Sequence, residues 1–239
     1  MSPALLARTR RPRPHVVLTH DERDLARIHD PGCNLAVWQR PRNATIERAA
    51  ERLAVATACE WRSTACLAES DAAIQDLVPA LVREREPEAA AALLADMALL
   101  VETFRRAHPD AHVEAALAML LAPQCPRFHT DFVGIRLLHT WCGPGTEWIA
   151  NEDVDRERLR NLDRGDAPPV LHKDFTTRHV EPFGVALLRG DASKGNAGNG
   201  IVHRSPDPRG KPRLLLTLDD GVRGDGPPPR RSRQQRRLK

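Results

Sequence analysis

Hydrophobic positions in the N-terminal part of the chain recur with the period of an α-helix. The positions with this spacing are Ile46, Ala49, Ala50, Leu53 and either Ala56 or Thr57. Because a spacing of three and four residues places such side chains on one helix face, the pattern predicts a helix that starts near Asn43. The apolar segment just before it, NLAVWQR at residues 34–40, predicts a short strand.

Two further segments rich in Ala and Leu continue the helical pattern. They are residues 69–85 and residues 87–109. Asp71 suits the N-cap of the first helix. Pro87 suits the first turn of the second, because proline lacks an N–H that this position would leave unused. The segments together predict a helical N-terminal layer over residues 34–109.

After residue 109 the pattern changes to short apolar runs separated by Gly and Pro. The segment 111–123 has helical propensity, yet it can also form a strand if tertiary contacts bury it. The later runs have the length and flanking residues of strands; they are residues 128–141, 146–150, 176–190, 200–206 and 213–219. We therefore expect an all-β domain over residues 110–220 that packs on the helical layer, which is an α+β fold.

The two ends of the chain are basic. Residues 1–14 carry a charge of +4 and residues 221–239 a charge of +6, so the formal net charge of +4 leaves −6 for residues 15–220. Because Pro- and Arg-rich ends bury little apolar surface, we expect residues 1–33 to form a flexible arm and residues 221–239 a disordered basic tail. The acidic body, the lack of Tyr and an aromatic content of only 4% argue against a nucleic-acid partner.

The lengths of the apolar stretches indicate where the protein is located, and the spacing of the cysteines indicates which class of metal site it can form. No apolar stretch has the length that spans a membrane, and the N-terminus lacks the apolar core of a signal peptide. We therefore expect a cytoplasmic protein without a membrane partner. The five cysteines have no CxxC spacing, which argues against a zinc knuckle, and a chain of 239 residues needs no disulfide bond to fold.

A histidine two residues before an aspartate occurs three times, and each pair is a candidate for metal ligation. The pairs are His108/Asp110, His129/Asp131 and His172/Asp174. The first pair lies at a predicted helix end, and the third lies too close to His203 for several strands to intervene. The pair His129/Asp131 opens an apolar run, and the interval to His203 holds enough strands to encircle a barrel. On a strand, both of its side chains point the same way.

His203 and Arg213 complete a pattern that suits a metal ion and an acidic cosubstrate. Two histidines and one carboxylate on one side of an iron ion leave positions open for a chelating cosubstrate and for oxygen. A 2-oxo acid with a distal carboxylate needs a charged, forked partner at a fixed distance, and Arg213, ten residues after His203, suits that role. We therefore take His129, Asp131 and His203 as candidate metal ligands.

This order of residues resembles a known enzyme family. An HxD pair, a long gap, a second histidine and an arginine ten residues later are similar to the iron(II)/2-oxoglutarate oxygenases with a double-stranded β-helix (jelly-roll) fold, particularly their prolyl-hydroxylase branch. The resemblance implies a jelly-roll metal-binding domain over residues 110–220. It also implies that His129, Asp131 and His203 are catalytic Fe(II) ligands, that Arg213 binds 2-oxoglutarate, and that a small molecule or a protein side chain is hydroxylated.

A narrower resemblance concerns the segments CPRFHTD, RLLHTWCGPGTEW and GIVHRSP. Together they are similar to a bacterial family of unknown function whose members are often encoded near zinc-homeostasis genes. A non-enzymatic protein that binds zinc through the same triad therefore stays open, as does a barrel-shaped interaction module without a metal. The chain has no Tyr to assist a 2-oxoglutarate carboxylate, and Leu-Leu follows Arg213 in place of the Arg-x-Ser pattern of other branches.

Further positions lie close in sequence to the candidate ligands. His139 shares the alternation of His129 and Asp131, so we expect it inside the barrel, as a core histidine rather than a fourth ligand. Thr146, which follows the turn GPG, can line the same pocket. These patterns indicate neither the substrate nor the oligomeric state.

Overall fold

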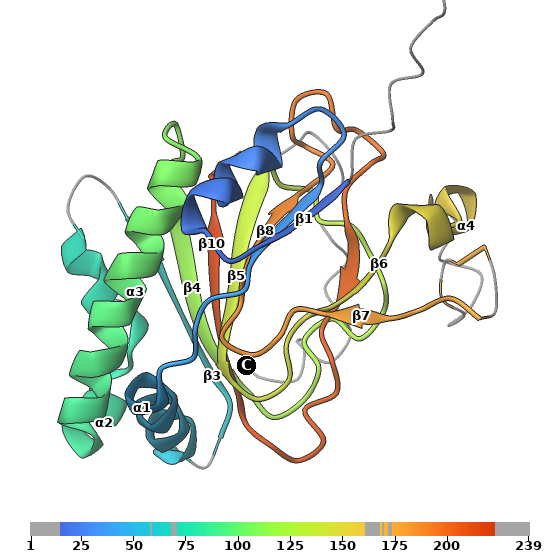
Figure 1. Ribbon diagram of the computed structural model, residues 1–239. Helices are drawn as coiled ribbons and strands as arrows, with labels where there is room; N and C mark the ends of the chain where they lie inside the picture. The colour runs from blue at the N-terminus through green and yellow to red at the C-terminus, as the bar shows by residue number, and fades with distance from the viewer. Residues whose placement is uncertain are drawn as a thin grey trace, which may run out of the picture.

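The strands form two sheets that pack against each other. The computed structural model describes residues 15–57, 59–67, 71–160, 168, 170–171 and 174–222. In it, a seven-stranded sheet has the order β1-β2-β8-β5-β10-β4-β3, and a three-stranded sheet has the order β7-β6-β9 (Figure 1). Neighbouring strands are antiparallel except for the parallel pair β1–β2.

The strands are short, as expected for a jelly roll. Those of the large sheet are β1 (Val16–Thr19), β2 (Leu35–Trp38), β3 (Trp61–Cys66), β4 (Glu114–Leu120), β5 (Ile135–Cys142), β8 (Val185–Arg189) and β10 (Arg213–Asp219). Those of the small sheet are β6 (Glu147–Ile149), β7 (Arg178–His179) and β9 (Val202–Arg204). The small sheet lies on the side of the large sheet away from α1, α2 and α3 (Figure 1).

The helices fall into a main layer and a few short turns. The α-helices are α1 (Ala44–Val55), α2 (Ala80–Arg85), α3 (Pro87–Ala107) and α4 (Arg156–Arg160). The 3-10 turns are η1 (Glu22–His29), η2 (Asp71–Leu77) and η3 (Asn151–Asp153). No helix formed by the described residues has the length and apolar character that crossing a membrane requires.

Local sequence signals explain where the main helices begin. The Asn43 side chain accepts hydrogen bonds from the N–H groups of Thr45 and Ile46, at 3.0 and 3.3 Å, so the predicted start of α1 is confirmed. Pro87 occupies the first turn of α3, as predicted. The single helix predicted over residues 69–85 is wrong, because η2 ends before Pro79, whose missing N–H cannot continue a helix.

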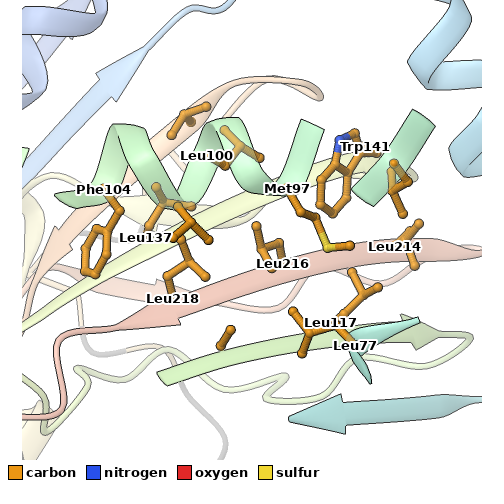
Figure 2. Packing of buried hydrophobic residues seen from close by; sticks show 14 of the residues in the cluster. Leu77, Met97, Leu100, Phe104, Leu117, Leu137, Trp141, Leu214, Leu216 and Leu218 are labelled. Atoms are coloured by element: carbon orange, nitrogen blue, oxygen red, sulfur yellow. The ribbon is translucent and has the colours of Figure 1, made fainter. Parts of the chain in front are cut away.

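A large core lies between the helical layer and the large sheet. Figure 2 shows Met97, Leu100 and Phe104 of α3 packed against strand side chains. The strand residues labelled there include Leu117, Leu137, Trp141, Leu214, Leu216 and Leu218. All are buried, and burial of apolar surface of this kind is the main force that holds helices onto a sheet.

A second core lies between the two sheets. It contains Leu138 of β5, Leu215 of β10 and Trp148 of β6. The chain passes repeatedly between the sheets, from β4 to a bridge at His129, then to β5, β6 and β7, back to β8, on to β9 and finally to β10. Strands that wind alternately through two facing sheets form a double-stranded β-helix. The predicted fold class, α+β with a jelly-roll core and an N-terminal helical layer, is confirmed.

The N-terminal segments contribute more to the sheet than predicted. The flexible arm was expected to reach residue 33, but β1 and η1 lie within residues 15–33, and β1 forms an edge of the large sheet. The segment 34–109, expected to be helical apart from one strand, also contains β3, which pairs with β4. The large sheet therefore takes strands from both sides of the expected boundary at residue 110. Residues 1–14 and 223–239 lie outside the described residues.

The ambiguous segment 111–123 forms β4 rather than a helix. Ala115, Leu117 and Met119 face the helical layer, whereas Ala118 and Leu120 face the small sheet. A central strand buried on both faces reads as a continuous apolar run, which resembles a helix in composition. Burial on both faces outweighs the helix propensity of Ala, Leu and Met here.

The structure corrects the prediction that His139 lies inside the barrel. His139 lies on the same face of β5 as Leu137 and Trp141, toward the helices, because the chain bends between Asp131 and β5 and the alternation is lost there. Its Nδ1–H donates to the Gly184 carbonyl at 3.1 Å, and its Nε2 has no hydrogen-bond partner among the described residues. His139 is therefore a core histidine, as expected, but in the other core.

Burial of His139 predicts a loss of stability in acid. Desolvation, and then the charge of Arg40, lower its pKa from 6.5 to about 4. Between these pH values the unfolded chain binds a proton that the folded protein excludes, so the free energy of unfolding falls by up to roughly 3 kcal/mol as the pH drops from 6.5 to 4. Urea unfolding of wild type and His139→Gln measures this loss, and the variant should show a shallower pH dependence. The exposed His179→Gln is the control, and equal slopes in all three proteins would disprove the effect.

Candidate metal centre

The structure brings His129, Asp131 and His203 together. One ligand atom from each lies within 4.8 Å of the others. Nε2 of His203 is 3.2 Å from Oδ2 of Asp131, and Nε2 of His129 is 3.5 Å from Oδ1. The side chains are 29%, 13% and 7% exposed for His129, Asp131 and His203, so the site is sheltered but open on the His129 side. Two imidazole nitrogens and a carboxylate converge on one point.

Backbone pairing places the two histidines side by side. The N–H of each donates to the carbonyl of the other, at 3.0 and 2.9 Å, so His129 is bridged to β9. Their side chains leave the same face of the small sheet, with ring centroids 4.6 Å apart. Asp131 follows in a bend rather than on the predicted strand, and the bend returns its carboxylate toward both rings.

Backbone carbonyls orient both imidazole rings for ligation through Nε2. Nδ1–H of His129 donates to the Arg127 carbonyl at 2.9 Å, and Nδ1–H of His203 donates to the Ile201 carbonyl at 3.1 Å. Because a carbonyl can only accept, each Nδ1 carries the proton and each Nε2 keeps a lone pair when the ring is neutral. Metal-binding histidines are commonly oriented by such a second hydrogen bond.

The site favours an ionised Asp131. Burial alone raises the pKa of its carboxyl, but His203, Arg136 and His129 together bring the pKa well below the usual range. Burial lowers the pKa of His129, and the Asp131 carboxylate more than offsets this, so the net shift is upward. A metal cation that replaces the proton on His129 would therefore lie beside the negatively charged Asp131 carboxylate.

Arg213 is a buried cation at the start of β10. Its side chain donates from Nη2 to the hydroxyl groups of Thr146 and Thr140, at 2.9 and 3.3 Å, and from Nη1 to Ser205 at 3.1 Å. Its Nε has no partner, and no carboxylate among the described residues pairs with it. The residue is 1% exposed, and burial lowers its pKa to about 10. A buried guanidinium with only hydroxyl partners lacks a counter-ion.

Arg213 lies one strand repeat from the triad. Ser205 lies two residues after His203. Trp148 of β6 pairs with His203 of β9, and Thr146 lies two residues before Trp148. Side chains two residues apart on a strand share a face and are roughly 7 Å apart. The hydroxyl groups of Ser205 and Thr146 are therefore on the barrel side of the small sheet, next along from the His203 ring, while Thr140 reaches Arg213 from β5 of the large sheet.

A surface hollow of about 970 Å³ lies at the Arg213 end of the barrel. It is lined by the turns before β6 and β10, including Gly143 and Ser205, and by α1 residues such as Glu51. None of the triad residues lines it. The hollow therefore borders segments next to the site, at Arg204 and Ser205, without including the triad itself.

Residues 19–219 match the family DUF1826, whose description is "Protein of unknown function". The chain belongs to the DUF1826 family. The matched range includes His129, Asp131, His203 and Arg213, so the candidate metal centre lies within the domain that defines DUF1826. No curated protein matches this DUF1826 sequence.

Several solved structures resemble this DUF1826 protein. A rice dioxygenase for auxin oxidation has 13% identity and a TM-score of 0.49, with 86% of this chain and 82% of that chain covered. A full-length Neurospora crassa protein in complex with alpha-KG and thymine has 10% identity and a TM-score of 0.48, with 86% and 84% covered. The Arabidopsis thaliana dioxygenase for auxin oxidation 1, bound to 2-oxoglutarate, has 10% identity and a TM-score of 0.46, with 88% and 93% covered.

The Gly- and Asn-rich loop of this DUF1826 protein holds the HxD bend in place. The Thr130 hydroxyl donates to Oδ2 of Asp191 at 2.6 Å, and the Asp191 N–H donates to the Asp131 carbonyl at 2.9 Å. A Cβ on Gly190 would lie 2.4 Å from the Val133 carbonyl oxygen and 2.7 Å from that of Asp131, so only glycine allows this approach. The sequence shows the glycine and the aspartate but not their contact with a bend some sixty residues earlier.

Sequence reasoning also missed Arg136, which contacts the triad directly. Its Nη1 donates to Oδ2 of Asp131 at 2.7 Å, while its Nε and Nη2 donate to Asp219 at 2.5 and 2.7 Å. Arg136 and Asp219 are register partners of β5 and β10, so the sheet itself sets this contact. A charged residue inside the apolar run GIRLLH was the available signal.

Of the described residues, the His108/Asp110 pair does not join the triad. His108 lies at the C-terminal end of α3, and its Nε2 is 3.2 Å from Oδ2 of Asp220 rather than near the metal centre. His172 lies outside the described residues. The choice of His129/Asp131 rests on the convergence of its side chains with His203.

Proposed function

We propose that this DUF1826 protein is an Fe(II)- and 2-oxoglutarate-dependent oxygenase that hydroxylates a small molecule or a protein side chain. The observation that carries the proposal is the buried Arg213, which has no carboxylate partner among the described residues and lies next to a His/Asp/His triad. Burying an ion without a counter-charge costs several kcal/mol. A dicarboxylate that reaches the metal at one end and Arg213 at the other supplies that charge.

The triad fits Fe(II). His129 and His203 would ligate through Nε2, and Asp131 would supply a negatively charged oxygen. Such a set occupies one side of the ion and leaves the other side open to a cosubstrate and to oxygen. Bound iron would supply the oxidising chemistry, in which the 2-oxo acid is decarboxylated. The chain's own residues bind the metal, orient the cosubstrate and shelter the centre from water.

Arg213 and its hydroxyl neighbours fit the distal carboxylate of 2-oxoglutarate. The guanidinium would donate two hydrogen bonds to it, and the hydroxyl groups of Thr146 and Ser205 can rotate to donate as well. These hydroxyl groups would take the place of the Tyr that the chain lacks. The repeat of roughly 7 Å between the rings and these hydroxyl groups suits a five-carbon dicarboxylate.

A zinc-binding protein without enzymatic activity is the alternative, because the same triad suits zinc. That function gives no role to Arg213. It would leave a buried cation near the site with no ligand to neutralise it. The oxygenase accounts for both features and is therefore the better proposal.

Anaerobic titration tests the proposal. Wild-type protein loaded with one equivalent of Fe(II) should develop a visible charge-transfer band when 2-oxoglutarate is added, and the loaded protein should consume 2-oxoglutarate once air is admitted. Iron binding with neither band nor consumption would reject the oxygenase and favour the zinc-binding protein. Failure to bind either metal would reject both.

A further inference from the structure

We propose that Arg136 is a positioning residue that restricts Asp131 to one metal-binding oxygen, Oδ1, and so keeps a coordination position free. The inference rests on the proposed function, because it needs a metal on the triad. It assigns a role to a residue outside the ligand set and outside the cosubstrate site.

The Arg136 guanidinium is fixed from one side. Two of its nitrogens donate to the Asp219 carboxylate, and strand pairing between β5 and β10 holds the two residues opposite each other. Its side chain is 21% exposed, and its third donor nitrogen reaches Asp131. A guanidinium held in this way cannot follow the Asp131 carboxylate if that group turns. Arg136 therefore sets the orientation of Asp131, and not the reverse.

The two oxygens of Asp131 have different surroundings. Oδ2 accepts from Nη1 of Arg136 at 2.7 Å and lies 3.2 Å from His203. Oδ1 lies on the side of His129, at 3.5 Å from its Nε2, and accepts nothing from Arg136. A carboxylate can bind a metal through one oxygen or through both. A charge-assisted hydrogen bond draws electron density from Oδ2 and fixes its direction, so Oδ1 is the oxygen that we assign as the metal ligand.

The number of ligating oxygens decides what else the metal can bind. In an octahedral centre, two histidines and a one-oxygen carboxylate take one face and leave the opposite face open. The cosubstrate that we propose chelates two positions of that face, and oxygen needs the remaining one. A carboxylate that ligated through both oxygens would take that last position. Arg136 would thus protect the oxygen position rather than the metal affinity.

Asp219 keeps the centre attractive to a cation. If Arg136 paired with Asp131 alone, it would cancel the charge of the ligand. Sharing one guanidinium between Asp131 and Asp219 leaves the group of three with a net negative charge. Asp131 can therefore be oriented by a cation without losing its attraction for Fe(II).

Nitric oxide, which binds Fe(II) where oxygen would bind, tests the inference without turnover. Under anaerobic conditions, wild type loaded with Fe(II) and 2-oxoglutarate should give the electron paramagnetic resonance signal of a high-spin iron-nitrosyl. Arg136→Met removes the donors and keeps the volume. It should retain Fe(II) and 2-oxoglutarate but lose at least about tenfold in nitric oxide affinity, whereas Arg136→Lys, which keeps a donor, should retain most of it.

Arg204→Met is the matched control. Arg204 is adjacent to His203 and pairs with Glu147 across β6 and β9, so its loss removes an ion pair beside the site without touching Asp131. Equal nitric oxide affinity in Arg136→Met and wild type, or equal losses in Arg136→Met and Arg204→Met, would overturn the inference. If Arg136→Met does not fold, Arg136→Gln, which is neutral and shorter, replaces it, and a nitric oxide affinity of Arg136→Gln equal to that of wild type overturns the inference. If wild type binds no Fe(II), the proposed function itself is rejected. That result differs from an unchanged nitric oxide affinity in Arg136→Met, which rejects only the role of Arg136.

Discussion

Arg213→Met should weaken 2-oxoglutarate binding roughly 30- to 150-fold while leaving Fe(II) bound, because a charge-assisted contact to a carboxylate contributes about 2–3 kcal/mol. Methionine fills a similar volume, so the barrel core should stay packed. The titration of the visible band in anaerobic, iron-loaded protein gives the 2-oxoglutarate affinity, and metal analysis gives the iron content. Unchanged 2-oxoglutarate affinity in the variant would show that Arg213 does not bind the cosubstrate, and the proposal of an oxygenase would lose its main support.

Stability measurements separate this role from a structural one. Arg213 has no counter-ion among the described residues, so Arg213→Met relieves the cost of burying that charge and should leave metal-free protein at least as stable to unfolding as wild type. Arg40 is the matched control, since its side chain is only 9% exposed but forms an ion pair with Asp96. Arg40→Met should cost about 3–5 kcal/mol, because it leaves the Asp96 carboxylate buried without its counter-ion, with the hydrogen bond from Nε1–H of Trp141 at 2.8 Å as its remaining partner.

Asp131→Asn should lower the affinity for Fe(II) more than about 100-fold, because even residues that only orient metal ligands contribute 10- to 100-fold. At a free Fe(II) concentration of about 100 times the dissociation constant, metal should stabilise wild type by about 2.7 kcal/mol and the variant by almost nothing. Thermal unfolding with and without Fe(II) measures both. His108→Gln, which alters another HxD pair, should keep the full stabilisation. Equal stabilisation of Asp131→Asn and wild type would exclude Asp131 as a ligand.

The site residues that lie far apart in the sequence could be predicted from their spacing. A jelly roll returns the chain to its starting point after a fixed number of strands, so His129, Asp131 and His203 could be grouped from their order along the chain. Arg213 follows by the same logic, since it begins the next strand after His203. Helix starts were also predictable, because capping by Asn43 and placement of Pro87 depend on neighbours in sequence.

Contacts set by strand pairing could not be predicted in this way. Arg136 reaches Asp131 only because β5 and β10 pair in a register that places Asp219 opposite it. The Asp191 contact with Thr130 joins two loops with no shared periodicity. His139 was placed on the wrong face because a bend after Asp131 interrupts the alternation, and β4 was ambiguous because both of its faces are buried.

The central claim is that one 2-oxoglutarate molecule spans the metal triad and Arg213. A crystal structure of the protein grown without oxygen, with Mn(II) in place of Fe(II) and with 2-oxoglutarate, tests it most directly. We expect Mn(II) bound by His129, Asp131 and His203 at roughly 2.0–2.3 Å, with the 2-oxo acid on the metal and the distal carboxylate on Arg213. Metal on the triad with 2-oxoglutarate bound elsewhere, or not at all, would contradict the claim.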